Sequence, residues 1–183
     1  GYSHDPDMNN PDSTGCGPVP MNNPDNVRMS AALSYLNPIR HRLNLTVKGG
    51  VLAHRVVFQG NRATGVEVES GDETFTVSGD EIVLCAGGIA SPRLLLLSGV
   101  GPAGHLGELG LRVVKDLPGV GQNLRDHPLI TIDLNQNSGV DLAGQTPRIQ
   151  VGLRYTATGS STRNDMQVFP SSYSGAVTGD PLQ

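Results

Sequence analysis

The chain has 183 residues, which is long enough for one domain or for parts of two. Its 13 basic and 17 acidic residues give a net charge of −4 without any basic block, which argues against nucleic acid or an anionic membrane surface as the main partner. No apolar run is long enough to cross a bilayer and the N-terminus lacks a signal pattern, so we expect a soluble protein without a transmembrane segment.

The two cysteines provide neither a disulfide framework nor a metal site. Cys16 lies in a stretch of glycine and proline, and Cys85 lies in an apolar run, so their spacing matches no zinc motif. We therefore expect a reducing, cytoplasmic location and no bound metal.

The first predicted elements are an extended loop over residues 1–28 and a short helix. The loop is rich in Pro, Asn, Asp and Gly, which favour turns over regular structure. The helix spans residues 30–36, where Ser30 is a suitable N-cap, and the Asn37-Pro38 pair is expected to stop it.

Residues 44–86 are predicted to contain a strand and a small antiparallel β-meander. A short strand is expected at residues 45–47. The meander is expected from three apolar or alternating runs, separated by turns that contain glycine, at residues 51–58, 63–69 and 74–77. Its acidic side chains, including Glu67, Glu69 and Asp72, should face water.

Residues 81–102 (E-I-V-L-C-A-G-G-I-A-S-P-R-L-L-L-L-S-G-V-G-P) predict a strand, a tight turn and a helix. The apolar, β-branched run at residues 81–86 is typical of a strand buried on both faces. Gly87-Gly88 permits a sharp turn and a close approach of another molecule to the backbone. Ser91-Pro92 is a helix start, with Ser as cap and Pro in the first helical position, and Gly99 is placed to end that helix.

Two interpretations of this stretch remain open from the residues alone. A buried strand that runs through Gly-Gly into a capped helix is how α/β folds present backbone amides to a nucleotide. The alternative is a structural turn between strand and helix, which is favoured at this point because short glycine motifs are common.

Residues 87–127 continue with this turn, its helix and further short elements. A second helix at residues 102–109 should be closed by Gly110, and a strand at residues 111–116 should lead into a loop at residues 117–127. Half-buried strands of an antiparallel sheet in another domain are then expected at residues 129–134, 149–155 and 166–169.

Two apparent signals do not support a site by themselves. Residues 99–104 match G-x-G-x-x-G and Asp116 resembles the acid that binds a ribose, but the match follows a helix instead of a strand, which predicts a turn between two helices. Among five histidines only His127, beside Asp126, is placed for chemistry, and a local hydrogen bond explains that pair more simply. The common hydrolase motifs are missing from the sequence.

Several motifs in order resemble the glucose-methanol-choline (GMC) family of flavoprotein oxidoreductases. They are N-V-R-M-S-A-A-L-S-Y-L-N-P before N-L-T-V, then R-A-T-G-V-E, then A-G-G-I-A-S-P-R-L-L-L-L-S-G-V-G-P, then D-L-P-G-V-G-Q-N-L-R-D-H. Together they cover residues 15–127, and the third resembles a signature of the family.

The resemblance implies an α/β protein that binds FAD and oxidises an alcohol by hydride transfer to the flavin. Residues 1–127 would form part of a Rossmann-like FAD-binding domain, and residues 128–183 would begin an antiparallel-sheet substrate domain. A small-molecule alcohol is the implied substrate, and choline dehydrogenase is the implied type of enzyme.

The resemblance also assigns cofactor-binding positions. Ala53 resembles the position whose main chain pairs with the adenine ring. Residues 85–87 resemble the strand end beside the ribose and adenine. The predicted cofactor-binding set is Ala53, Cys85, Ala86, Gly87 and Ser91. Residues 123–127 are expected near the junction of the two domains, and the substrate side is assigned to Met166, Gln167 and Phe169.

The family's phosphate-binding G-x-G-x-x-G and its catalytic histidine have no counterpart here, so the chain is expected to be the middle of a longer enzyme. No catalytic residue is assigned, because the resemblance points to no base within this sequence. Two alternatives stay open. One is a hydroxynitrile lyase on the same FAD scaffold, and the other is a non-catalytic fragment that associates with copies of itself.

Overall fold

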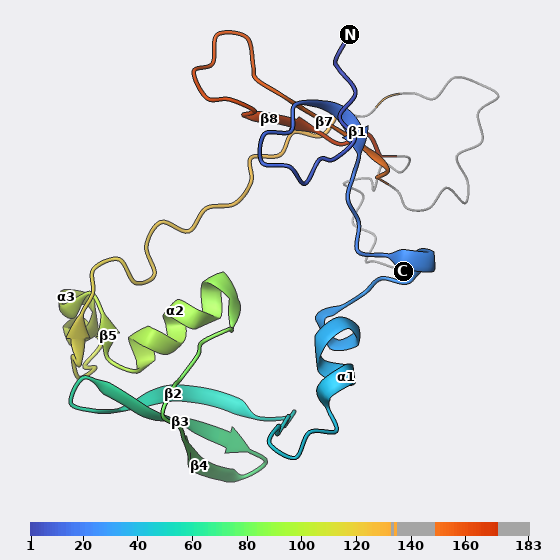
Figure 1. Ribbon diagram of the computed structural model, residues 1–183. Coiled ribbons are helices and arrows are strands. Elements are labelled where there is room, and N and C mark those ends of the chain that lie inside the picture. The colour runs from blue at the N-terminus through green and yellow to red at the C-terminus, as the bar shows by residue number, and fades with distance from the viewer. Residues whose placement is uncertain (133, 135–148, 172–183) are drawn as a thin grey trace. The chain divides into compact units, whose positions relative to one another are not determined.

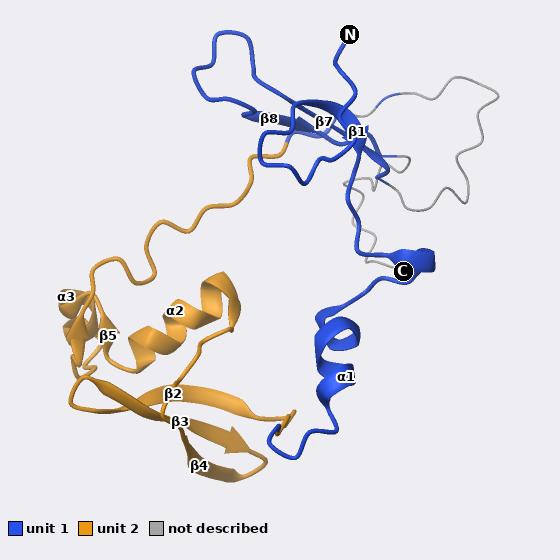
Figure 2. Ribbon diagram, in the orientation of Figure 1, with its two compact units in different colours: residues 1–45, 130–183 blue, residues 46–129 orange. Residues whose placement is uncertain are grey.

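The computed structural model describes residues 1–132, 134 and 149–171 (Figure 1). The chain divides into two compact units, Thr46–Leu129 and a discontinuous one made of Gly1–Leu45 and Ile130–Gln183 (Figure 2). The predicted boundary at residue 127 is close to the end of the continuous unit, whereas residues 1–45 belong with the C-terminal segment. The assignment of these regions to a FAD domain and a substrate domain stays a prediction.

The continuous unit contains the predicted meander. Strands β2 (Leu52–Gln59), β3 (Arg62–Ser70) and β4 (Glu73–Ser78) form an antiparallel sheet in the order β2-β3-β4. The two connecting turns contain Gly60 and Gly71, both at positive φ, which glycine adopts at little cost. The alternation of apolar residues and the glycines of the turns therefore determine the meander from neighbouring residues alone.

Helix α2 (Gly87–Leu97) packs on β2 and is followed by β5 (Val100–Gly101), α3 (Ala103–Glu108) and β6 (Lys115–Asp116). β5 and β6 pair in parallel, so only the end of the strand predicted at residues 111–116 is in a sheet. Gly99 ends α2 at a φ of 82°, and Gly110 follows α3 at 70°, as predicted. The core of this unit is formed by Val56, Val68, Leu94, Val100 and Leu106.

The prediction of a buried strand at residues 81–86 is wrong. The segment is irregular, Cys85 is exposed and the Val83 side chain is 70% exposed. A strand that is buried on both faces needs neighbours for its backbone and for both faces. None of the strands in the described part of the chain pairs with this segment.

The prediction that Ser91 and Pro92 begin the helix is also wrong. α2 begins one turn earlier at Gly87, with Ala86 as N-cap, and Pro92 lies inside it. The Ser91 hydroxyl accepts a hydrogen bond of 3.0 Å from the backbone N–H of Ala86. Ser91 thus satisfies one of the free amides at the helix start from inside the first turns.

The discontinuous unit is built on a second antiparallel sheet. β1 (Gly15–Pro18), β7 (Val151–Tyr155) and β8 (Met166–Val168) form it in the order β1-β7-β8, which confirms the strands expected near residues 149–155 and 166–169. β1 falls in the region predicted as loop. Its Gly-Cys-Gly-Pro sequence has little intrinsic preference for a strand, and its pairing with β7 makes it one.

Three further expectations concern short segments. Residues 45–47 are irregular, as are the described residues of the strand predicted at 129–134, where Leu129 and Ile130 are exposed; both predictions are wrong for the residues described. Ser30 caps the predicted helix by accepting a hydrogen bond from the N–H of Leu33. The helix, however, passes from a π-helical stretch (Ala32–Leu36) into α1 (Asn37–Ile39), which ends one residue after Pro38. Pro38 lies in the first turn of α1, where a missing backbone N–H is tolerated.

Candidate cofactor site

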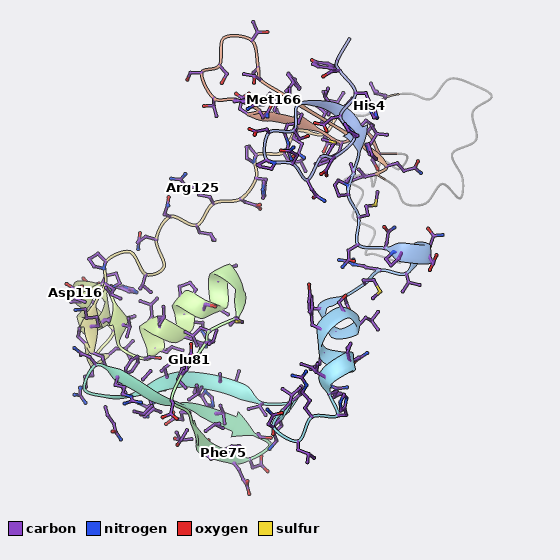
Figure 3. The ribbon with its side chains drawn as sticks, viewed as in Figure 1. His4, Phe75, Glu81, Asp116, Arg125 and Met166 are labelled. Atoms are coloured by element: carbon purple, nitrogen blue, oxygen red, sulfur yellow. The ribbon has the colours of Figure 1, made fainter. Side chains whose placement is uncertain are left out.

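Four of the five predicted cofactor residues lie together at the N-terminus of α2. The connection that follows the meander passes Glu81 (Figure 3) and ends at Cys85 and Ala86. Gly87 is the first residue of α2, and Ser91 lies one turn further. Residues 85–88 are all exposed. The main chain at this point is therefore accessible to a ligand.

Gly87 gives this connection its shape. Its φ is 84°, which side chains with a Cβ rarely adopt, and a Cβ built there would meet no atom within 4 Å. The need for glycine at Gly87 is thus conformational, and the space beside the backbone is open. Gly88 is similarly open, with only the Leu124 side chain near a Cβ at that position.

Ala53, the fifth residue, lies on β2 next to a β-bulge. Ala53 pairs with Val68 and Arg55 pairs with Glu67, which leaves His54 as the extra residue of the ladder. Bulges bend a strand locally and are frequent beside functional sites. The small, half-buried Ala53 side chain fits the requirement of a position that must pack beside a flat ring.

Two glutamates on β3 contact the two residues that follow Ala53. His54 Nε2 lies 2.8 Å from Glu69 Oε2, and Arg55 forms two hydrogen bonds with the Glu67 carboxylate. Glu67 and Glu69, which were expected to face water, thus have partners across the strands.

A contact that the sequence did not predict links β2 to α2. The Ser98 side chain follows the last residue of α2 and is buried, and its hydroxyl accepts a hydrogen bond of 2.8 Å from the N–H of Val56. Ser98 also donates to the carbonyl of Leu94. In the sequence, Ser98 is only part of the L-S-G run. That run does not predict a partner for Ser98 on β2.

A groove of about 540 Å³ lies beside α2. It is lined on the helix by Gly88, Ile89, Pro92, Arg93 and Leu96, and on the following loop by Gly121, Gln122, Asn123, Leu124 and Arg125. The structure thus brings the start of α2 close to residues 123–125, which belong to the segment predicted to lie near the junction of the two domains.

His127 forms only a local pair, and the residues assigned to the substrate side belong to the other unit. His127 donates its backbone N–H to the neighbouring Asp126 carboxylate, and both side chains are fully exposed, which supports the local interpretation of that pair. Met166 and Gln167 lie on β8 and Phe169 just after it, in the other unit. Within the residues described, His, Cys, Asp and Glu form no cluster of three or more that could hold a metal ion.

The sequence model of the family described as GMC oxidoreductase matches residues 1–129. The chain belongs to the GMC oxidoreductase family. A GMC-type oxidoreductase of Rhodococcus erythropolis is 38% identical over 99% of this chain and 36% of its own length. Human mitochondrial choline dehydrogenase is 41% identical over 85% of this chain and 27% of its own. The chain therefore spans about a third of these relatives or less.

A solved structure supports the fold. A FAD-dependent oxidoreductase from Chaetomium thermophilum matches 61% of this chain and 20% of its own at 36% identity, with a TM-score of 0.58. FAD is the cofactor of the GMC family, and the mixed α/β class with antiparallel sheets is confirmed. In the described part of this GMC chain, no helix has the length and apolar character needed to cross a membrane.

The start of α2 leaves room for a ligand beside its main chain. Residues 85–88 expose their backbone where a Cβ at Gly87 would have only open space beside it, and Ala53 is small. A flat group such as an adenosine could approach the main chain of Gly87, because a Cβ built there meets no atom within 4 Å. The cofactor-binding role of Ala53, Cys85, Ala86, Gly87 and Ser91 stays a prediction.

Proposed function

We propose that this chain supplies the adenosine side of the FAD site in an enzyme that oxidises a small alcohol, as the choline dehydrogenases it resembles are named to do. The observation that carries the proposal is the exposed backbone of residues 85–87 at the start of α2, in a chain whose family is GMC oxidoreductase. Ala53 on β2, which α2 packs against, completes the set.

The residues of this chain would bind and orient the cofactor. Cys85 and Gly87 would face the ribose and adenine through their main chain, since their exposed backbone leaves room for them. Ser91 would act indirectly, because its hydroxyl holds the Ala86 amide and thereby the path of the connection. When bound, FAD supplies the acceptor for the hydride that leaves the alcohol carbon.

The alcohol oxidation also needs a base within hydrogen-bond reach of the substrate hydroxyl. We assign no such residue in this chain. His127, the histidine that the sequence places best, is fully exposed beside Asp126. The chain's proposed contribution is therefore to cofactor binding and not to proton transfer.

The first experiment measures cofactor and reaction together in the full-length gene product. The protein, expressed with excess FAD, should carry flavin absorbance, and choline or another small alcohol should bleach it without oxygen. Absence of flavin would contradict the proposal. Release of cyanide from mandelonitrile without flavin reduction would instead place the protein among the hydroxynitrile lyases.

The second experiment tests the assigned position on β2. Ala53→Gln should weaken FAD binding to the apoprotein at least tenfold, because the longer side chain would occupy the space assigned to the adenine. Leu52→Gln is the matched control, since Leu52 is the adjacent, 56% exposed residue and neighbours on a strand point to opposite faces. Equal FAD affinity of the two variants would contradict the role of Ala53.

A further inference from the structure

The hydroxyl of Ser98 forms a polar contact between β2 and the end of α2. Ser98 is only 7% exposed. Its hydroxyl accepts a hydrogen bond of 2.8 Å from the N–H of Val56 and donates one to the carbonyl of Leu94. The single donor of the hydroxyl and one of its two acceptor lone pairs are therefore used inside the protein. Ser98 is not available to contact a substrate or cofactor.

The contact joins an edge strand to a helix. Among the strands that the structure describes, β2 pairs with β3 alone, so its outer edge carries backbone groups that need other partners. The apolar contacts around it, which include the buried Val56 and Leu94, are not directional and would tolerate sliding of the strand along the helix. A hydrogen bond of good geometry tolerates little sliding, because it weakens steeply with angle.

Both elements that Ser98 joins carry predicted cofactor residues. Ala53 lies three residues before Val56 on β2, a rise of about 10 Å along a strand. Gly87 lies at the opposite end of α2 from Ser98, about 16 Å away at 1.5 Å per residue of an 11-residue helix. The register of β2 on α2 thus sets the spacing between Ala53 and the start of the helix.

We propose that Ser98 is a positioning residue of the cofactor site, whose hydroxyl fixes β2 on α2 so that Ala53 and residues 85–87 keep the spacing that the adenosine group requires. This inference rests on the proposed function of those residues. Loss of the hydroxyl leaves the buried Val56 N–H without its partner and lets β2 settle in a different register.

The test compares three variants of the full-length gene product. Ser98→Ala removes the hydroxyl, Ser98→Thr retains it, and Leu106→Ala removes packing from the fully buried side chain of α3, which takes no part in the β2–α2 hydrogen bond. Each is measured for its unfolding temperature, for the Kd of FAD titrated into the apoprotein, and for the visible circular dichroism of the bound flavin.

We expect Ser98→Ala to raise the Kd of FAD about tenfold, which corresponds to a loss of about 1.4 kcal/mol, and to change the circular dichroism of the flavin. Ser98→Thr should keep the Kd within about twofold of the wild-type value and leave the circular dichroism of the flavin unchanged. Leu106→Ala should lower the unfolding temperature at least as much as Ser98→Ala and leave the Kd and the spectrum unchanged.

Equal effects of Ser98→Ala and Leu106→Ala on the Kd would overturn the proposal, because they would show a purely structural role. If Ser98→Ala does not fold, Ser98→Cys gives the same comparison, since a thiol keeps the size and weakens the hydrogen bond. In another outcome the wild type binds FAD, while Ala53→Gln binds it weakly and the Ser98 variants bind it normally. That result overturns this inference and leaves the proposed function standing. A wild type that binds no FAD overturns both the inference and the proposed function.

Discussion

Arg55 and Glu67 face each other across β2 and β3 and form a two-pronged ion pair. Arg55 Nε donates to Oε1 of Glu67 at 3.0 Å, and Nη2 donates to Oε2 at 2.7 Å. These hydrogen bonds are the main cause that lowers the pKa of Glu67 below its ordinary value of 4.5. The pair lies directly after the bulge beside Ala53, so it contributes to the shape of the strand there.

The ion pair predicts how stability depends on pH. A carboxyl whose pKa is lowered on folding stabilises the protein above its unfolded pKa, and that contribution is lost as the pH falls through the folded pKa. We therefore expect Glu67→Gln to lower the unfolding temperature at pH 7, and the gap from wild type to close as the pH falls below 4.5. Glu73→Gln, which removes an exposed acid from β4, is the control. A gap that stays constant down to pH 3 would contradict this explanation.

Gly99 should be the least replaceable of the turn glycines in the continuous unit. A Cβ there would overlap the carbonyl of Arg112, and its φ is 82°. Gly60 has a φ of 60° but open space around it, so Gly60→Ala should cost only the backbone penalty of about 1 kcal/mol. We expect Gly99→Ala to cost at least twice as much in chemical denaturation. Similar losses for the two variants would show that the backbone around residue 112 relaxes.

Asp116 should act as a helix cap and not as a ribose ligand. Its Oδ1 accepts a hydrogen bond of 3.0 Å from the N–H of Ala103, at the first residue of α3. Asp116→Ala should destabilise the protein by about 1 kcal/mol, as loss of a cap does, while Asp116→Asn keeps the acceptor and most of the stability. Neither change should alter the Kd of FAD. A tenfold weaker Kd for Asp116→Asn would revive the rejected dinucleotide interpretation of residues 99–104.

Asn164 should hold the N-terminal loop of the discontinuous unit. Its Nδ2 donates to the carbonyl of Ser13, and its Oδ1 accepts from the hydroxyl of Thr14, at 2.8 and 2.9 Å. Asn164→Ala loses both bonds and also places alanine at a φ of 55°. We expect faster proteolysis within residues 1–14, together with a loss of about 2 kcal/mol.

Asn164→Gly separates the two causes, because glycine loses the hydrogen bonds and accepts the backbone conformation. It should be destabilised less than Asn164→Ala. A proteolysis rate equal to that of wild type in both variants would mean that other contacts hold the loop.

The isolated chain of 183 residues should associate with copies of itself. Large apolar side chains stand exposed at Val83, Ile89, Leu129, Ile130 and Ile132, with exposed fractions of 70–87%. Exposed apolar surface of this kind favours association. Light scattering should show dimers or larger species that grow with concentration, and Ile130→Lys with Ile132→Lys should reduce them. A clean monomer at high concentration would contradict this prediction.

The sequence predicted those elements whose cause is local. The meander follows from alternation and from Gly60 and Gly71, which have the backbone freedom that their turns need. The ends of α2 and α3 follow from Gly99 and Gly110 for the same reason. Ser30 capped its helix as predicted, because a cap bonds only to amides within one turn.

The elements that depend on distant partners were predicted poorly. Residues 81–86 have the composition of a buried strand, but pairing and burial come from neighbours, and the described strands provide none for it. β1 shows the reverse case, since an unlikely sequence becomes a strand when β7 pairs with it. Motif resemblance, not periodicity, identified the GMC family, and it assigned Ala53 and residues 85–87 without any geometry.

The sequence by itself thus determined the family, the meander and the turns, because these are written in neighbouring residues. Only the tertiary structure decided that Ser91 lies inside α2 and caps it from there, that a bulge follows Ala53, and that Ser98 joins α2 to β2. Ser98 and Val56 are 42 residues apart, and a hydrogen bond over that separation has no signature in local sequence. Such contacts form only when the chain brings its elements together.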